Sequence, residues 1–214
     1  MKNVLKTTLI LIAYVFVTYH FVGKVIVPTF CPDEQHIVND FGTYYVASRL
    51  VAQGSIPYRS IDNHHNMELT SYELASWEMN KRVIPAYIYP PFLAVALIPL
   101  SKFAFPEARF LWSIFSFICF LLCIFLTFRL LKLRPKLDIT TLLIFSVFLA
   151  SMPTLESFTL GQVNYAVLLL ILCSFVFHKQ KRATLGGAAL AIASLIKVSP
   201  ALCSASNGIG LFSN

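Results

Sequence analysis

Five stretches of this sequence contain no Asp, Glu, Lys or Arg and are each at least 17 residues long. They cover residues 7–23, 83–101, 110–128, 139–155 and 157–177, and a shorter sixth run covers 183–196. A helix needs about 20 apolar residues, with roughly 17 as the lower limit, to cross a bilayer. Charged residues make up only 13% of the chain, well below the share in soluble domains. The sequence therefore predicts an all-α, polytopic membrane protein and excludes a soluble globular fold.

The cations gather in three short clusters beside the apolar runs. The first is Lys2 with Lys6, the second lies within residues 129–136 and the third within 179–182. Seven of the ten acids fall instead between residues 29 and 87. Cytoplasmic loops carry an excess of Lys and Arg. We therefore expect the three clusters in the cytoplasm and the loop of about 29–87 outside, and we attribute the net charge of +7 to membrane orientation rather than to nucleic-acid binding.

The proline-rich run at 83–101 makes this topology ambiguous. Two apolar runs, 83–101 and 110–128, separate the acidic loop from the second cationic cluster, and both cannot cross if that cluster is cytoplasmic. Proline removes a backbone donor and breaks helices. Either the 83–101 run is re-entrant or lies along the outer face, or it is a short crossing that leaves the second cluster outside.

The long loop has the pattern of short amphipathic helices. Apolar residues between Phe41 and Val51 follow helical spacing, with Asn39 or Asp40 as the N-cap and Gly54 as the stop signal. A second amphipathic stretch runs from about 70 to 82. We expect both helices to lie on the outer membrane surface.

Two ionisable residues of this loop helix are candidates for chemistry. Asp40 lies near the predicted membrane surface, where its carboxylate suits a general base that acts on a hydroxyl. The alternative for Asp40 is a helix N-cap, and the two roles are compatible. Arg49 lies nine residues further along and is a candidate for binding phosphate, with an exposed cation on a surface helix as the alternative.

Polar side chains also interrupt the later apolar runs. Gln162 and Asn164 need partners there, since unsatisfied amides in hydrocarbon cost several kcal/mol. Either they bond a neighbouring helix or they face a site at the outer end of a span. Lys197 would lie near the outer face, where it either binds a lipid phosphate or extends to the interface.

No arrangement of residues indicates a metal site or a disulfide framework. Asp33-Glu34 and His64-His65 lack a further ligand at suitable spacing, and four of the five cysteines lie within or beside apolar runs. We expect the chain to need no metal and no cofactor.

Five short motifs, in order, resemble glycosyltransferase family 87, whose members use polyprenol-phosphate-mannose. They are Asp40 with Tyr44; Gly54-x-x-Pro57-Tyr58; Tyr89-Pro90-Pro91 with Pro99 and Trp112; Gly161-Gln162-x-Asn164; and Gly186-Gly187 followed by Ile196-Lys197-x-x-Pro200. The resemblance implies a GT-C-like fold in the cell membrane and a site at the extracytoplasmic face. It also implies a polyprenyl-phosphate sugar donor and a lipid or glycan acceptor.

By this resemblance Asp40 is the catalytic base. We assign the donor and sugar contacts to Tyr44, Arg49, Tyr89, Gln162, Asn164 and Lys197, with Arg49 chosen only for its helical spacing to Asp40. Residues 1–200 would form the N-terminal half of the transmembrane domain. Residues 201–214 break the apolar pattern, which we interpret as truncation or a frameshift, so the chain would be incomplete and inactive alone. The alternatives are a transporter or assembly subunit without catalysis, and a ligase that transfers lipid-linked oligosaccharides.

Overall fold

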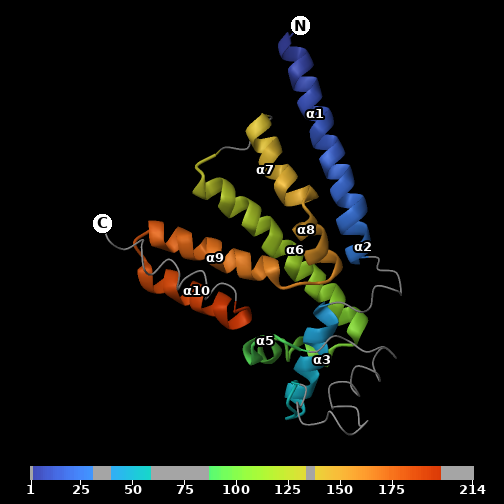
Figure 1. The fold of residues 1–214 in the computed structure, drawn as a ribbon, viewed down its shortest axis with the longest axis vertical. Helices are drawn as coiled ribbons and strands as arrows, with labels where there is room; N and C mark the ends of the chain where they lie inside the picture. The colour runs from blue at the N-terminus through green and yellow to red at the C-terminus, as the bar shows by residue number, and fades with distance from the viewer. Residues whose placement is uncertain (1, 31–39, 59–86, 134–137, 199–214) are drawn as a thin grey trace.

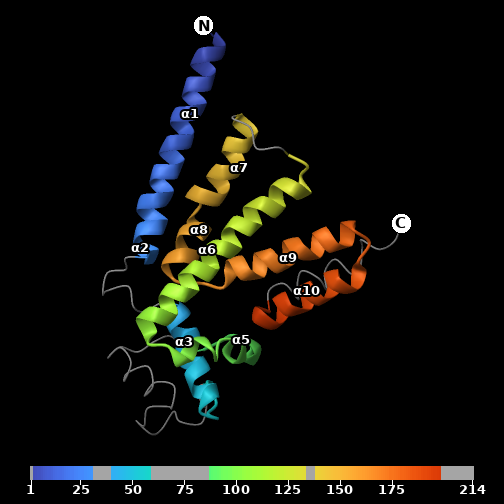
Figure 2. The ribbon, with the colours of Figure 1, turned by 180° about the vertical axis from the view of Figure 1, so that it is seen from behind.

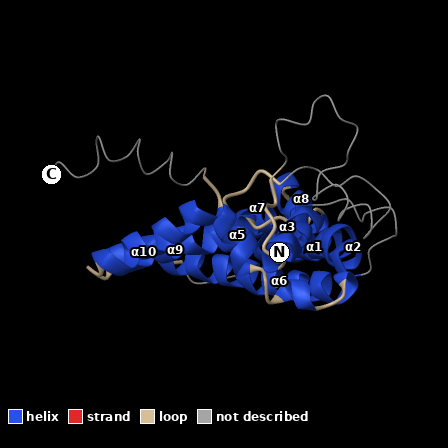
Figure 3. Cartoon of the chain, turned by 90° about the horizontal axis from the view of Figure 1, so that it is seen from below, coloured by secondary structure: helices blue, strands red, loops and turns tan. Residues whose placement is uncertain are grey.

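The computed structural model describes residues 2–30, 40–58, 87–133 and 138–198. All regular structure in these ranges is helical, as Figure 3 shows. The elements are α1 (Lys2–Phe21), the π-helix η1 (Val22–Ile26), α2 (Val27–Phe30), α3 (Asp40–Ala52), α5 (Pro91–Ala96), the 3-10 helix η4 (Leu100–Lys102), α6 (Phe105–Leu130), α7 (Ile139–Ala150), α8 (Met152–Thr159), α9 (Asn164–Lys179) and α10 (Ala183–Ile196).

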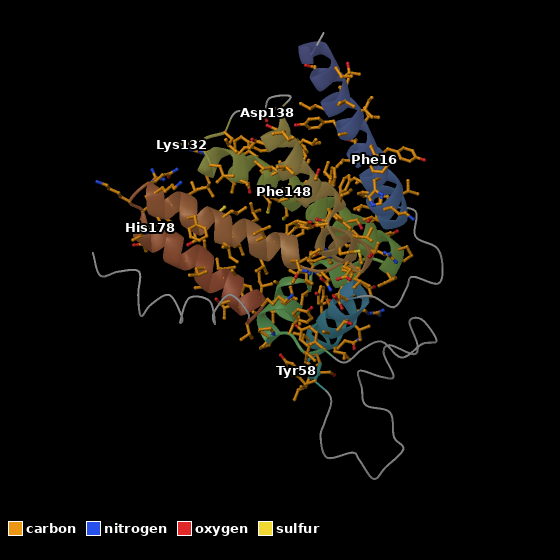
Figure 4. The ribbon with its side chains drawn as sticks, turned by 45° about the horizontal axis from the view of Figure 1, so that its top comes forward. Phe16, Tyr58, Lys132, Asp138, Phe148 and His178 are labelled. Carbon is orange, nitrogen blue, oxygen red and sulfur yellow. The ribbon has the colours of Figure 1, made fainter. Side chains whose placement is uncertain are left out.

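Three helical stretches in the described part of the chain are long and apolar enough to cross a membrane. They are Thr7–Ile26, Phe105–Leu130 and Ile139–Thr159. Their outward faces carry large exposed apolar side chains such as Phe16, which is labelled in Figure 4. Such a surface is compatible with lipid and not with water. The chain is thus an all-α membrane protein, as its charge-free runs predict.

The cationic segments lie at one end of the structure. The Lys179 Nζ atom donates to the Leu130 carbonyl at 3.0 Å, so the end of α9 lies beside the end of α6. A hydrogen bond between the side chains of Tyr14 and Thr141 places a point just past the middle of α1 beside the start of α7. In Figures 1 and 2 the start of α1, the end of α6 and the start of α7 all lie in the upper part of the molecule, and α3 and α5 lie at the lower end. This arrangement agrees with the charge pattern of the sequence.

The described part of the proline-rich run, from residue 87 onward, does not form a crossing helix. Within residues 87–102, α5 has six residues and η4 has three. Six helical residues span about 9 Å, against roughly 30 Å of hydrocarbon. Pro90 and Pro99 precede the two helices and stand at their N-caps. Of the two alternatives, the structure therefore supports a segment that stays at one end of the molecule, beside α3.

Helix α3 forms where the sequence predicts it but is enclosed by protein. It ends before Gly54, which has φ +77° and closes the helix with the hydrogen bond from the Ser55 amide to the Leu50 carbonyl. Every residue from Phe41 to Ser48 is buried. A helix lying on a membrane surface would present one polar face, so the expected surface position is wrong for α3. Tyr45 and Phe105 pack edge to face at 5.3 Å and help to enclose it.

A second core holds the long helices together. The Phe120 ring on α6 packs against Phe21 at 5.4 Å, Phe158 at 5.4 Å and Tyr165 at 5.1 Å. These contacts link α1, α6, α8 and α9 around one aromatic side chain, since aromatic pairs add specific geometry to apolar burial. The amphipathic stretch at 70–82, Asp33-Glu34, His64-His65 and the tail 201–214 lie outside the described residues.

Candidate functional site

A tight turn between α8 and α9 joins two distant segments. Gly161 has φ +68°, a conformation that favours glycine. Its carbonyl accepts a hydrogen bond from Trp112 Nε1 at 2.8 Å, and the carbonyl of Leu160 accepts one from the Phe41 amide at 3.2 Å. A Cβ atom at position 161 would lie 2.8 Å from Phe41 Cβ. The turn thus fixes the first turn of α3 directly beside the first turn of α9.

The two amides of this turn form one hydrogen-bonded group with Lys197. Asn164 Nδ2 donates to the side chains of Gln162 and of Ser157, the latter at 3.1 Å. Lys197 Nζ donates to Asn164 Oδ1 at 2.9 Å, across 33 residues of sequence. The amides therefore bond neighbouring segments, which is the first of the two alternatives that the sequence leaves open. Lys197 follows the end of α10 and is half-buried.

Asp40 and two tyrosines adjoin this group. Asp40 begins α3 and is half-buried, and its charge acts on the phenols of both Tyr44 and Tyr89. The rings of Tyr44 and Tyr89 meet edge to face at 4.9 Å. The hydroxyl of Tyr44 adjoins the backbone of Val163, between Gln162 and Asn164. We call the cluster of Asp40, Tyr44, Tyr89, Gln162, Asn164 and Lys197 the polar cluster.

The Tyr44 hydroxyl is the unusual member of the polar cluster. The side chain is 0% exposed, and its hydroxyl makes no hydrogen bond of good geometry with the described residues, although Tyr89 and the backbone of Val163 are near. A buried polar group without a partner is rare and calls for an unseen water, ion or ligand group. The Tyr44 hydroxyl is thus a buried donor whose nearest polar neighbours are Tyr89 and the backbone of Val163.

The environment keeps both phenols protonated. Burial raises the pKa of Tyr44 far above its usual value, and Tyr89 and Asp40 act in the same direction. Burial also raises the pKa of Tyr89; the nearby hydroxyl of Tyr44 opposes this rise and the charge of Asp40 adds to it. Neutral phenols donate hydrogen bonds and do not accept protons as bases at physiological pH. In the polar cluster, Asp40 is therefore the group suited to accept a proton.

Arg49 is not part of the polar cluster. Nine residues at 100° each place Arg49 half a turn round the helix from Asp40 and about 13 Å along it. Its side chain is exposed, and its guanidinium lies 5.9 Å from the ring centroid of Tyr45. The structure thus places the predicted phosphate contact on the opposite face of α3. Among the sequence candidates, it is the one that does not join the others.

Two further residues at this end were not singled out from the sequence. Ser157 is buried and accepts from Asn164. Arg109 is 8% exposed in the second turn of α6 and is a buried cation at the start of an apolar helix. The only signal for Arg109 is its charge just before the 110–128 run, whereas nothing in the pattern marks Ser157.

The polar cluster holds a carboxylate, neutral phenols, amides and an ammonium group. In the described part of the chain, no three His, Cys, Asp or Glu side chains come together in a way that could hold a metal ion. Cys119, Cys123 and Cys173 are free thiols. A helical membrane protein with an acid, a cation and hydrogen-bond donors at one end of its helices is suited to bind a polar, anionic group at the membrane surface.

The comparison with protein families assigns the chain to a known family. The sequence model of glycosyltransferase family 87 matches residues 87–206, which is more than half of the chain. The chain belongs to glycosyltransferase family 87. Tyr89, Gln162, Asn164 and Lys197 lie inside the match, whereas Asp40, Tyr44 and Arg49 precede it. No curated protein and no solved structure shows significant similarity to the chain.

Proposed function

We propose that the chain transfers a hexosyl group, mannosyl by the family resemblance, from a polyprenyl-phosphate donor to an acceptor hydroxyl. The reaction would take place at the extracytoplasmic face of the cell membrane, in the polar cluster. The observation that carries the proposal is the meeting of Asp40, the Gln162–Asn164 pair and Lys197 at the end opposite the cationic segments. Family membership supports glycosyl transfer in general. The donor, the acceptor and the face of the membrane are proposals.

Asp40 is the general base in this proposal. It accepts the proton of the acceptor hydroxyl while the acceptor oxygen forms a bond to the anomeric carbon of the sugar. The bond from that carbon to the phosphate oxygen breaks, and the polyprenyl phosphate leaves with the electron pair. A lipid phosphate is already a good leaving group, so one base and nearby positive charge suffice without a metal. Attack opposite the leaving group inverts the anomeric carbon.

Lys197 and the amides bind the donor. An ammonium group has three donors, and the bond to Asn164 uses one of them. The others are available for the donor phosphate, a charge-assisted interaction of the strong kind. Asn164 also donates to Gln162 Oε1, which leaves the N–H groups of Gln162 to meet sugar hydroxyls. Tyr44 and Tyr89, held neutral by burial, are donors to the carboxylate or to the phosphate.

The lengths of α9 and α10 favour a lipid-linked donor. With 16 and 14 residues, these helices are about 24 Å and 21 Å long, shorter than the roughly 30 Å hydrocarbon core. The end of α9 at Lys179 lies beside the end of the long helix α6. If that end is at one interface, Asn164 and Lys197 are recessed from the other. A donor anchored by its own lipid reaches a recessed phosphate site from within the membrane.

Asp40→Asn tests the base directly. We expect the variant to fold but to transfer sugar from a polyprenyl-phosphate donor about 10²–10⁴-fold more slowly, the usual contribution of a general base. Glu107→Gln is the matched control, because Glu107 is an exposed carboxylate near the same end that binds the Ala104 amide at the start of α6. Undiminished transfer by Asp40→Asn would remove Asp40 from the mechanism.

Lys197 is tested by a pair of substitutions. Lys197→Met should raise the KM for the donor, while Lys197→Arg, which keeps the charge, should restore most of the donor affinity. Equal KM values for the two variants would show that Lys197 does not bind the phosphate. A transporter would not transfer sugar from the donor to an acceptor. These assays therefore also separate the enzyme from that alternative.

A further inference from the structure

Helices α6 and α9 end in the same way, with lysine in an unusual conformation. Lys132 has φ 54° and Lys181 has φ 59°. After α6, the Leu133 amide donates to the Phe128 carbonyl at 3.0 Å, and after α9 the Arg182 amide donates to the Phe177 carbonyl at 2.9 Å. Both are Schellman motifs, in which the residue with positive φ is usually glycine.

The same motif carries glycine at the other end of the molecule. Helix α3 closes with Gly54 and α8 with Gly161, each with the corresponding pair of backbone hydrogen bonds. A lysine in this conformation is less stable than glycine, because its Cβ approaches the following carbonyl oxygen. The two lysines therefore occupy positions where the backbone favours glycine, and their charge or length offers a reason for their presence.

The two helix ends form one basic surface. The hydrogen bond from Lys179 Nζ to the Leu130 carbonyl joins them. Five exposed cations belong to the surface: Arg129, Lys132, Lys179, Lys181 and Arg182. The sequence has no acid between residues 129 and 137 or between 157 and 187. Asp138, the nearest acid along the chain after Lys132, is occupied as the N-cap of α7, where it accepts from the Thr141 amide at 2.8 Å. In Figure 4, Lys132 and His178 mark these two helix ends.

We propose that the joined ends of α6 and α9 bind the phosphate headgroup of an anionic membrane lipid. The position of the basic surface at the end of a membrane span indicates that its partner is a lipid headgroup. Helix α6 is the longest of the candidate spans, and the end of a span lies at the level of the headgroups. Lysine and arginine side chains near a membrane surface attract anionic lipids. The site is distinct from the polar cluster and lies in the opposite leaflet, so it does not depend on the proposed sugar transfer.

The test replaces both lysines with the residue that the backbone prefers. Native mass spectrometry of the full chain in a non-ionic detergent would follow titration with phosphatidylglycerol and with phosphatidylcholine. At about 1 kcal/mol for each lysine, Lys132→Gly with Lys181→Gly should weaken phosphatidylglycerol binding about 25-fold. With phosphatidylcholine present, the same double variant should melt at a higher temperature than the parent chain, because glycine removes the clash between Cβ and the following carbonyl oxygen at both positions.

Two controls separate the outcomes. Lys102→Gln removes an exposed cation at the other end of the molecule and should leave phosphatidylglycerol binding unchanged. Lys132→Asn with Lys181→Asn, neutral residues that tolerate positive φ, should reproduce the loss seen with glycine. Unchanged phosphatidylglycerol affinity in both double variants would overturn the proposal. Equally tight binding of inorganic phosphate alone would assign the surface to a soluble anion and would also overturn it.

Discussion

The substitution Gly161→Ala perturbs the contact that brings Asp40 to the amide pair, and its cost can be worked out from two separate effects. The first is backbone strain at φ +68°, about 1–2 kcal/mol for a residue with a Cβ atom. The second is the approach of the new Cβ atom to Phe41 Cβ at 2.8 Å. Phe41 is 1% exposed and stacks on Trp112 with ring centroids 5.6 Å apart, so it has little room to move. Overpacking of this kind costs about 1–3 kcal/mol.

We therefore expect Gly161→Ala to destabilise the protein by about 2–5 kcal/mol. Gly54→Ala is the matched control, because Gly54 has φ +77° but no atom within 4 Å of the added Cβ position. The control should lose only the backbone contribution of about 1–2 kcal/mol. Reversible unfolding of both variants in detergent micelles, followed by circular dichroism, gives the comparison. Equal losses in the two variants would refute the claim that the turn is packed against α3.

Further predictions concern Tyr44. Tyr44→Phe removes a buried hydroxyl that has no partner of good geometry, so stability should be unchanged or rise by about 1 kcal/mol, whereas sugar transfer should fall; a parallel loss of both would contradict a ligand-binding role. The raised pKa of Tyr44 also predicts the sign of a pH effect. The folded state keeps this proton above pH 10, where the unfolded state releases it, so stability should fall as the pH rises past about 10. Tyr44→Phe should make that fall shallower in chemical denaturation, and an unaltered slope would show that Tyr44 is not buried.

Local sequence signals were sufficient for the individual helices. The apolar spacing after Asp40 and the stop at Gly54 predict α3 within a residue or two of its observed bounds. The long charge-free runs likewise locate α1 and α6. These features depend on residues close in sequence, through hydrogen bonding at helix ends and through the length needed to cross a bilayer. Interactions between residues close in sequence therefore account for the positions of the individual helices.

The breaks within the apolar runs were harder to predict. The sequence suggests spans at 139–155 and 157–177, but the structure has a stretch at Ile139–Thr159, interrupted at Ser151, and then α9 from Asn164. Pro153 permits a new helix start at its first turn, and Gly161 provides the positive φ that ends α8. Both residues lie inside runs that hydropathy treats as continuous, so charge alone misplaces the boundary.

The polar cluster could be predicted only as a set of candidates. Asp40 is visible in the sequence as an acid of the loop, Gln162 as an amide inside an apolar run and Lys197 as a cation just after one. The bond between Lys197 and Asn164, however, joins positions 33 residues apart. This bond forms because α9 and α10 pack as a hairpin, and Gly186 lets the two helices approach each other closely. A Cβ atom at position 186 would lie 3.2 Å from the Ser174 carbonyl oxygen. Arg49 lies apart from the polar cluster for a simpler reason, since residues nine positions apart point to opposite faces of a helix.

Accessibility of single cysteines, introduced into a chain without its native cysteines, tests the central claim most directly. Positions 40, 162 and 197 are half-buried rather than enclosed, so a small membrane-impermeant thiol reagent should reach all three from the same side. A polyprenyl-phosphate donor, at a concentration that saturates each variant, should slow all three reactions together. Cysteines at 132 and 181 should react only from the opposite side. Labelling of any of the first three positions from the side of 132 and 181, or donor protection of only one of them, would contradict a shared pocket.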